Sequence, residues 1–250
     1  MTYSLTISAR SKNPNQKIKE FLEQNFFGID TDKIDSIFAF SDPCKLYGGR
    51  TYTGYELSYL DLKWMYDNNI GYRIPLSNFL ATDEIYQSEL NFLTKHHKKG
   101  NSVIVMKDLL AKRIKNDFPL YSVECSVTKQ IETAEELHKA LELYDTAVPL
   151  PIAFNTNYEL LESFTQDIKD RIRLFLNVGC AYTCPASICY ASMSRMNIGV
   201  KDAKFECSQL NKKHYIPSGM TNFDIEDYLN RGYTKFKMLR AKKTPIPTGY

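Results

Sequence analysis

Four cysteines stand close together in the second half of the sequence, and together they have the chemistry of a metal site. With three, four and seventeen residues between successive members, they are Cys180, Cys184, Cys189 and Cys207. Gly179 and Pro185 favour a chain that turns between them, so that several thiolates can meet at one point. One pair has the separation that structural zinc sites use, but single cysteines follow it. The irregular spacing therefore favours a 4Fe-4S cluster, with zinc as the alternative.

Two further cysteines complete the set of six. Cys44 lies in the segment SDPCKLYGGR, just beyond a predicted strand, and it is a fifth candidate ligand. Cys125 ends another predicted strand, where we expect a thiol that packs in the core. The same packing role is the alternative for the clustered cysteines, because a cysteine is often a small buried apolar side chain.

Short β-rich runs alternate with amphipathic helical segments along the chain, which is the order of a parallel sheet with helical crossovers. The predicted strands are residues 3–9, 36–40, 72–77, 102–106, 120–125, 148–154, 173–177 and 235–239. The predicted helices are residues 15–25, 56–68, 84–98, 108–116, 133–143, 157–168 and 222–230. Thr133 and Glu136 have the spacing of a capping box. Eight strands are the number that closes a (β/α)8 TIM-like barrel, and an open doubly wound sheet is the second possibility.

The composition is that of a soluble globular chain: 250 residues, 32 Lys+Arg, 29 Asp+Glu and 43% hydrophobic residues. No linker divides it, which predicts one domain over residues 1–250 with a Cys-rich loop insertion at 178–234. We expect a cytoplasmic protein without a membrane span, because apolar runs are short and the N-terminus does not resemble a signal peptide. Only eleven residues follow Leu239, so the barrel is predicted to lack its last helix. The uncovered face of the eighth and first strands then becomes a candidate surface for a hetero- or homodimer.

Loops that follow the carboxyl ends of barrel strands form the face where chemistry is expected. Four predicted substrate-binding residues follow strands in this way: Arg50, Asn78, Asn177 and Arg240. Residues 195–250 also carry eleven Lys and Arg against five Asp and Glu, which indicates a basic surface for an anionic partner. No pair of carboxylates and no Ser/His/Asp order stands out, so the catalytic residues stay unidentified at this level.

Three segments in order along the chain resemble the U32 peptidase-like barrels. They are GGRTYTGYELSYLDLKWMYDNNIGYRIPLSN, LFLNVGCAYTCP and YLNRGYTKFKMLRAKK. The first is similar to that family's exit from strand two with the next helix and strand. The second is similar to its strand-seven motif, an Asn followed by Cys and then Cys-Pro, and the third to its closing strand.

This resemblance implies a barrel that holds a four-cysteine iron–sulfur cluster. Some family members take part in oxygen-independent hydroxylation of ubiquinone precursors or RNA bases, and others are described as proteases. In one branch a ligand cysteine lies just past strand two, which implies Cys44 together with three of the clustered cysteines. The function implied is an iron–sulfur-dependent hydroxylase or oxidoreductase acting on an aromatic ring or nucleobase. The alternatives are a non-catalytic, metal-stapled barrel that binds another enzyme subunit, and a U32-type hydrolase.

Overall fold

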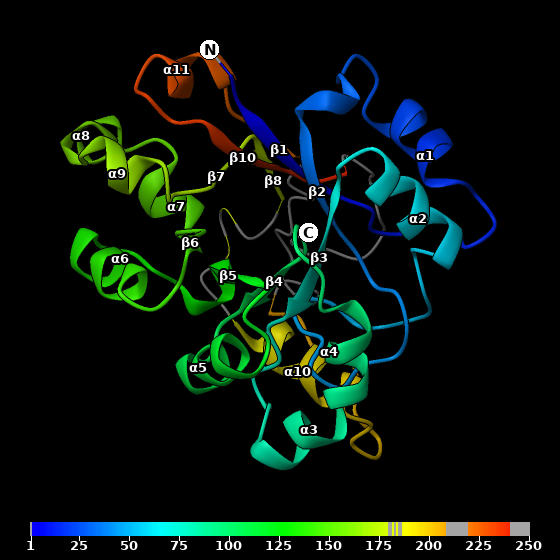
Figure 1. The fold of residues 1–250 in the computed structure, drawn as a ribbon. Helices are drawn as coiled ribbons and strands as arrows, with labels where there is room; N and C mark the ends of the chain where they lie inside the picture. The colour runs from blue at the N-terminus through cyan, green and yellow to red at the C-terminus, as the bar shows by residue number, and fades with distance from the viewer. Residues whose placement is uncertain (1, 180–181, 183, 185–186, 209–219, 241–250) are drawn as a thin grey trace.

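Eight parallel strands form one curled sheet that helices surround (Figure 1). The computed structural model describes residues 2–179, 182, 184, 187–208 and 220–240. The sheet strands are β1 (Ser4–Ser8), β2 (Ile34–Phe38), β3 (Gly71–Leu76), β4 (Ser102–Val105), β5 (Ser122–Cys125), β6 (Thr146–Ala147), β7 (Leu174–Phe175) and β10 (Lys235–Met238). Their order is β6-β5-β4-β3-β2-β1-β10-β7, and a parallel bridge between Ala147 and Ile172 joins the two edges. The curled parallel sheet is consistent with the predicted TIM-like arrangement, and its strand order is not that of the open doubly wound alternative.

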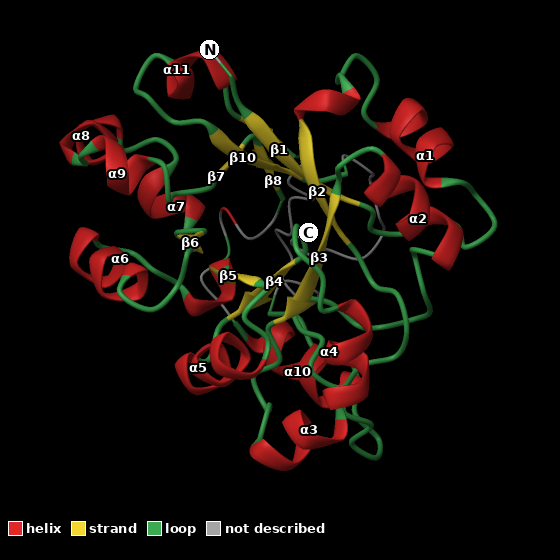
Figure 2. Ribbon diagram, in the orientation of Figure 1, coloured by secondary structure: helices red, strands yellow, loops and turns green. Residues whose placement is uncertain are grey.

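The helices lie outside the ring of strands, as Figure 2 shows. They are α1 (Ile18–Asn25), α2 (Tyr59–Asp67), α3 (Asp83–Ser88), α4 (Leu90–His96), α5 (Asp108–Asp117), α6 (Ala134–Leu141), α7 (Pro151–Phe154), α8 (Tyr158–Ser163), α9 (Gln166–Lys169), α10 (Ile188–Asn197) and α11 (Ile225–Leu229). Two 3₁₀ turns lie at Thr31–Lys33 and Val127–Lys129. A separate antiparallel pair joins β8 (Asn177–Val178) to β9 (Thr221–Asn222).

Alternating residues of each strand enter two different environments, as the two-residue period of β-structure requires. Ile7, Ile37 and Ile74 are fully buried in the large apolar layer that the helices cover. Ser36 and Arg73, which alternate with the last two, face the interior of the barrel instead. The predicted capping box of α6 is confirmed, since the side chains of Thr133 and Glu136 exchange hydrogen bonds with backbone amides.

Four predicted elements need correction. The helix predicted at 157–168 is two helices, α8 and α9, and the strand predicted at 173–177 is two strands, β7 and β8, which belong to different sheets. The strand predicted at 148–154 is wrong: the strand is Thr146–Ala147, and residues 151–154 form α7. Pro149 has no amide hydrogen for a strand ladder, and Pro151 suits the first position of a helix, whose amide needs no partner. The single helix predicted at 84–98 is two helices, α3 and α4, which meet at Glu89.

The region predicted as a Cys-rich loop contains regular structure. Residues 178–234 include α10, which the sequence reasoning missed, as well as β9 and α11. The sequence of α10, ICYASMSRMN, buries Ser192 and Ser194 beside Tyr190 and Met193, so its buried face is not marked by apolar residues at helical spacing.

Two expectations concern the end of the chain and the exterior. Residues 241–250, where an eighth helix would stand, lie outside the described residues, so the missing helix and the partner surface beside it stay predictions. In the parts that the structure describes, no helix combines the length and the apolar character needed to cross a membrane.

Candidate functional site

Three of the four clustered cysteines lie near enough to one another for their thiols to interact electrostatically. Cys189 lies in the first turn of α10, Cys184 precedes this helix, and Cys207 follows it. Burial and the neighbouring thiols of Cys207 and Cys184 raise the pKa of Cys189 to about 11. The sulfur of Cys184 also lies 3.5 Å from the hydroxyl oxygen of Ser208. The predicted gathering of Cys180 cannot be followed, because that residue lies outside the described residues.

Cys207 is held beside α10 by the residues just before it. The buried hydroxyl of Ser192 accepts a hydrogen bond from the Glu206 amide at 3.1 Å and donates one to the Cys189 carbonyl at 2.9 Å. Arg195 pairs with the Glu206 carboxylate at 3.0 Å. One helix therefore carries one thiol and positions the segment that carries a second.

The same helix is docked on the loops that follow β2 and β3. Asn197 donates to the carbonyl oxygens of Tyr47 and Arg50 at 2.8 and 2.9 Å, and it accepts from the Tyr52 amide at 2.8 Å. Asn78 was predicted to bind substrate, but its amide group joins these loops to the helix. It donates to the carbonyls of Lys45, Tyr47 and Ser194, and the Ser194 hydroxyl accepts from the Phe79 amide at 3.0 Å.

Replacement of Asn197 by alanine is expected to loosen α10 from the barrel, because three backbone groups lose their side-chain partner at about 1 kcal/mol each. Hydrogen–deuterium exchange should become faster in residues 47–52 and 188–197, and alkylation of Cys189 should become faster with it. Asn116→Ala is the matched control, since the Asn116 side chain bonds only the exposed neighbour Asp117 in the described structure. Unchanged exchange in both segments would show that the docking does not depend on Asn197.

The chemistry of the donor set fits a soft metal or an iron–sulfur group. All three side chains that meet are thiols, and thiolates are the ligands that such groups take. Within the described residues, however, no set of three or more His, Cys, Asp or Glu side chains already stands at the spacing of a metal site. The described thiols therefore supply the right donors without forming a closed site among themselves.

The other two cysteines belong to different surroundings. Cys44 is buried in the apolar layer under the helices, where burial and the nearby Glu89 carboxylate raise the pKa of its thiol well above the usual value. The thiols that act on Cys189 are those of Cys184 and Cys207, and the charged neighbour of Cys44 is Glu89. Cys125 is fully buried, with its pKa also raised by burial, as expected of a packed core thiol.

The remaining predicted substrate-binding residues take different roles. Arg50 pairs with both oxygens of Glu56, and its guanidinium lies 4.0 Å from the centroid of the Phe40 ring. Asn177 exchanges two hydrogen bonds with the backbone of Leu239 and so fastens β8 to the end of β10. Arg240 donates to the Asn25 side chain and to the carbonyls of Arg10 and Ser11, which turns it towards the N-terminal segment.

Arg50 also borders two cavities. A cavity of about 430 Å³ lies between the loops at residues 10–14 and 50–56 and α10, with Arg10, Met193, Met196 and Phe205 among its lining residues. A second, smaller cavity lies inside the mouth of the barrel and shares Arg10 and Arg50 with the first. Arg50 thus lines both cavities while its guanidinium is paired with Glu56, and its role as a substrate contact stays a prediction.

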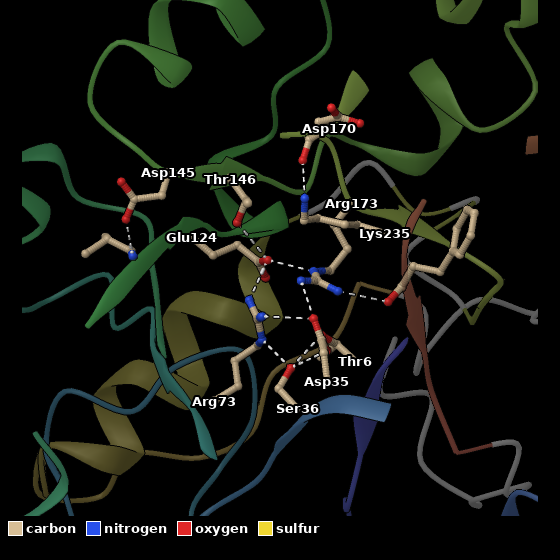
Figure 3. A network of polar contacts seen from close by, with 12 residues as sticks. Thr6, Asp35, Ser36, Arg73, Glu124, Asp145, Thr146, Asp170, Arg173 and Lys235 are labelled. Atoms are coloured by element: carbon tan, nitrogen blue, oxygen red, sulfur yellow. Dashed lines mark hydrogen bonds and ion pairs between the residues drawn. The ribbon is translucent and has the colours of Figure 1, made fainter. Parts of the chain in front are cut away.

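The centre of the barrel holds a buried network of charges (Figure 3). The Oε2 atom of Glu124 accepts from Arg73 at 2.6 Å, from Arg173 at 2.9 Å and from Thr146 at 3.1 Å. Arg173 also donates to Asp35 at 3.1 Å. Burial alone would raise the pKa of Glu124, but Arg73 and Arg173 lower it to about 2.

The sequence reasoning missed this network and also Lys237, which borders the barrel cavity. A signal was present. Glu124 stands in VECSV and Lys237 in KFKM, so each is a charged residue at an alternate position of a strand with apolar neighbours. In a closed barrel such positions face the interior, where charges must find partners.

Comparison with known proteins supports the architecture. A scan against protein-family models and a search of curated proteins find no match. Among solved structures, the chain is similar to the U32 peptidase Mk0906, with 15% identity, a TM-score of 0.61, and coverage of 98% of this chain and 95% of that one. At this identity the likeness concerns the fold alone. The chain therefore has the barrel fold of a solved U32 peptidase, as the three sequence segments predicted.

Proposed function

We propose that this protein is an iron–sulfur protein whose cluster is bound by Cys184, Cys189 and Cys207 together with Cys180. The observation that carries the proposal is that the thiols of Cys184 and Cys207 are near enough to Cys189, on α10, to raise its pKa. Cys180 precedes Cys184 by four residues and is the natural fourth ligand. Cys44, the other candidate, is the weaker choice because its thiol is buried next to Glu89.

The proposed activity is an oxygen-independent hydroxylation, or a related redox modification, of an aromatic ring or nucleobase. A bound cluster would supply one-electron transfer at this face of the barrel. The chain's own contribution is placement: Asn78 and Asn197 fasten the cysteine helix to the barrel, beside the cavity of about 430 Å³. Phe205 and Met193 offer that cavity apolar contacts, which suits a flat ring.

Cys189→Ala is expected to remove most of the iron, because a ligand in the middle of the set is lost. Protein purified without oxygen should be brown and contain about four iron and four sulfide per chain, and the variant should lose at least half of both. Cys125→Ala is the matched control: it deletes a thiol that is packed in the core, so its iron and sulfide should stay at the level of the unmodified chain.

Two outcomes contradict the cluster. A colourless protein with one zinc per chain would establish the zinc alternative, and unchanged iron in Cys189→Ala would remove the ligand assignment. The reaction is tested separately, by mass spectrometry of RNA and quinones from cells with and without the gene. Loss of a one-oxygen mass shift supports the proposed activity. Iron-loaded protein with no such shift would favour the non-catalytic partner role.

A second candidate is a U32-type hydrolase, which the likeness to the solved U32 peptidase favours. Ser41, Asp42 and His96 do lie together, but both partners meet the same atom of the histidine, Nε2, at 3.3 and 3.2 Å. A hydrolytic triad uses the two ring nitrogens separately, one for the serine and one for the carboxylate. If labelled casein is still hydrolysed by Ser41→Ala, the protein is a protease that does not use Ser41, Asp42 and His96. If the unmodified protein hydrolyses no casein, the hydrolase candidate is removed.

A further inference from the structure

Lys237 of β10 places an ammonium group inside the barrel. The residue is only 5% exposed. Its Nζ atom lies 4.5 Å from the centroid of the Phe38 ring and 5.5 Å from that of Phe175. Among the described residues, no carboxylate stands within ion-pair distance of this atom. A buried ammonium that contacts two aromatic faces lacks the ion pair with an anion that would stabilise its charge most strongly.

The charges around Lys237 do not balance. Glu124 is the carboxylate that acts on the Lys237 charge, but that group already pairs with Arg73 and Arg173, and Asp35 pairs with the same two arginines. Among the described residues of this network, three cations thus share two carboxylates. Burial lowers the pKa of Lys237 to about 8, with Arg73 and Arg173 acting in the same direction and Glu124 in the opposite one. One negative charge is missing from this interior.

A cavity of about 50 Å³ adjoins the ammonium at the mouth of the barrel. Phe38, Ile104 and Val127 form apolar walls, and Ser8 and Ser77 add hydroxyl groups. The volume is that of one or two water molecules, on the order of 30 Å³ each, so it suits a carboxylate group better than a phosphate.

Gly48, which also lines this cavity, shows how closely the chain segments approach here. A Cβ atom on Gly48 would lie 2.2 Å from the carbonyl carbon and oxygen of Ser77, at the end of β3. The mouth of the barrel is therefore closely packed around a small, mostly apolar space whose lining includes Lys237 together with Arg10 and Arg50, the latter already paired with Glu56.

We propose that this cavity binds the carboxylate group of a small apolar or aromatic acid, with the Lys237 ammonium as its ion-pair partner. The carboxylate group enters the cavity and supplies the missing negative charge, and the body of the acid lies outside this small volume, at the mouth of the barrel. The proposal goes beyond the iron–sulfur function and does not depend on it, since the cavity and the lysine involve none of the cysteines.

Benzoate is the probe, and calorimetric titration of the full chain near pH 7 is the measurement. We expect saturable binding of benzoate that is at least about tenfold tighter than that of benzyl alcohol or inorganic phosphate. Lys237→Met should abolish this preference. Lys235→Met is the matched control on the same strand, because the Lys235 ammonium bonds the Asp170 carbonyl, and it should leave benzoate binding unchanged. Affinity should fall between about pH 7 and pH 9.5, as the ammonium deprotonates.

The stability of Lys237→Met separates binding from a structural role. Methionine fills a similar volume and removes an uncompensated buried charge, so its melting temperature is expected to equal or exceed that of the unmodified protein. Equal affinity for benzoate and benzyl alcohol, or benzoate binding that persists in Lys237→Met, would overturn the proposal. Because neither result involves iron, failure here leaves the iron–sulfur proposal standing, and the reverse is also true.

Discussion

Replacement of Glu124 by alanine is expected to lower the free energy of unfolding by about 3–5 kcal/mol, because it leaves the guanidinium groups of two buried arginines without their main partner. Arg73 and Arg173 are 6% and 2% exposed, and both donate to the same carboxylate oxygen. Urea denaturation at neutral pH, followed by circular dichroism, measures the loss.

Two variants and a pH series test the cause. Glu124→Gln keeps one acceptor oxygen and should cost less than the alanine, and Glu135→Ala on the exposed side of α6 should stay within about 0.5 kcal/mol. The folded-state pKa of Glu124, about 2, lies below its ordinary value of 4.5. The stabilisation is therefore complete above pH 4.5 and is lost as the pH falls towards 2. A difference between Glu124→Ala and the unmodified chain that does not shrink in acid would contradict this account.

Replacement of Asp61 by alanine is expected to cost a similar amount, about 3–5 kcal/mol, for a different set of contacts. The Asp61 carboxylate pairs with Lys12 at 2.9 Å, and the Lys12 side chain is fully buried. The same carboxylate accepts from the amides of Ile18, at the start of α1, and Ser58, at the cap of α2. The substitution thus strands a buried ammonium and removes the capping contacts of two helices.

Thermal unfolding of three variants shows whether the cost at Asp61 comes from the loss of a buried ion pair and its hydrogen bonds or only from the removal of a charge. Asp61→Asn keeps one acceptor oxygen, which can serve only one of the two amides, and should lose less than Asp61→Ala. Asp67→Ala breaks the exposed Lys63–Asp67 pair on the same helix and is expected to cost less than about 1 kcal/mol. If Asp61→Ala and Asp67→Ala unfold at the same temperature, the buried pair does not stabilise the fold as argued.

The strands and most helices could be predicted because their signals are local. Apolar residues at alternate positions predict β1 to β5, and Thr133 with Glu136 predicts the start of α6, without knowledge of any distant residue. The prediction failed at 148–154, where the apolar run VPLPIAF outweighed two prolines that end one element and begin another. It also missed α10, because two of the buried positions of that helix are serines, which are held by hydrogen bonds and leave no apolar pattern in the sequence.

In the candidate site, too, some residues could be predicted from local sequence and others could not. Cys184, Cys189 and Cys207 could be grouped from spacing, because a short chain segment limits how far its thiols can separate. Cys44 could not be placed: its loop follows β2, but the direction of its side chain depends on packing against the α3–α4 junction. The same holds for Arg240, whose guanidinium finds Asn25 across the barrel's outer layer rather than a substrate.

The sequence by itself determined the parallel alternation of strands and helices, the barrel that follows from it, and the grouping of the cysteines. The reason is that the periodicity of apolar residues and the short separation of the cysteines are local properties of the sequence. Only the tertiary structure decided that Glu124 meets Arg73 and Arg173, which stand 51 and 49 residues away, and that Lys237 is left over beside a cavity. The register of neighbouring strands and the closure of the ring set which interior side chains share one level. A buried charged side chain can form ion pairs only with the interior side chains at the same level of the barrel.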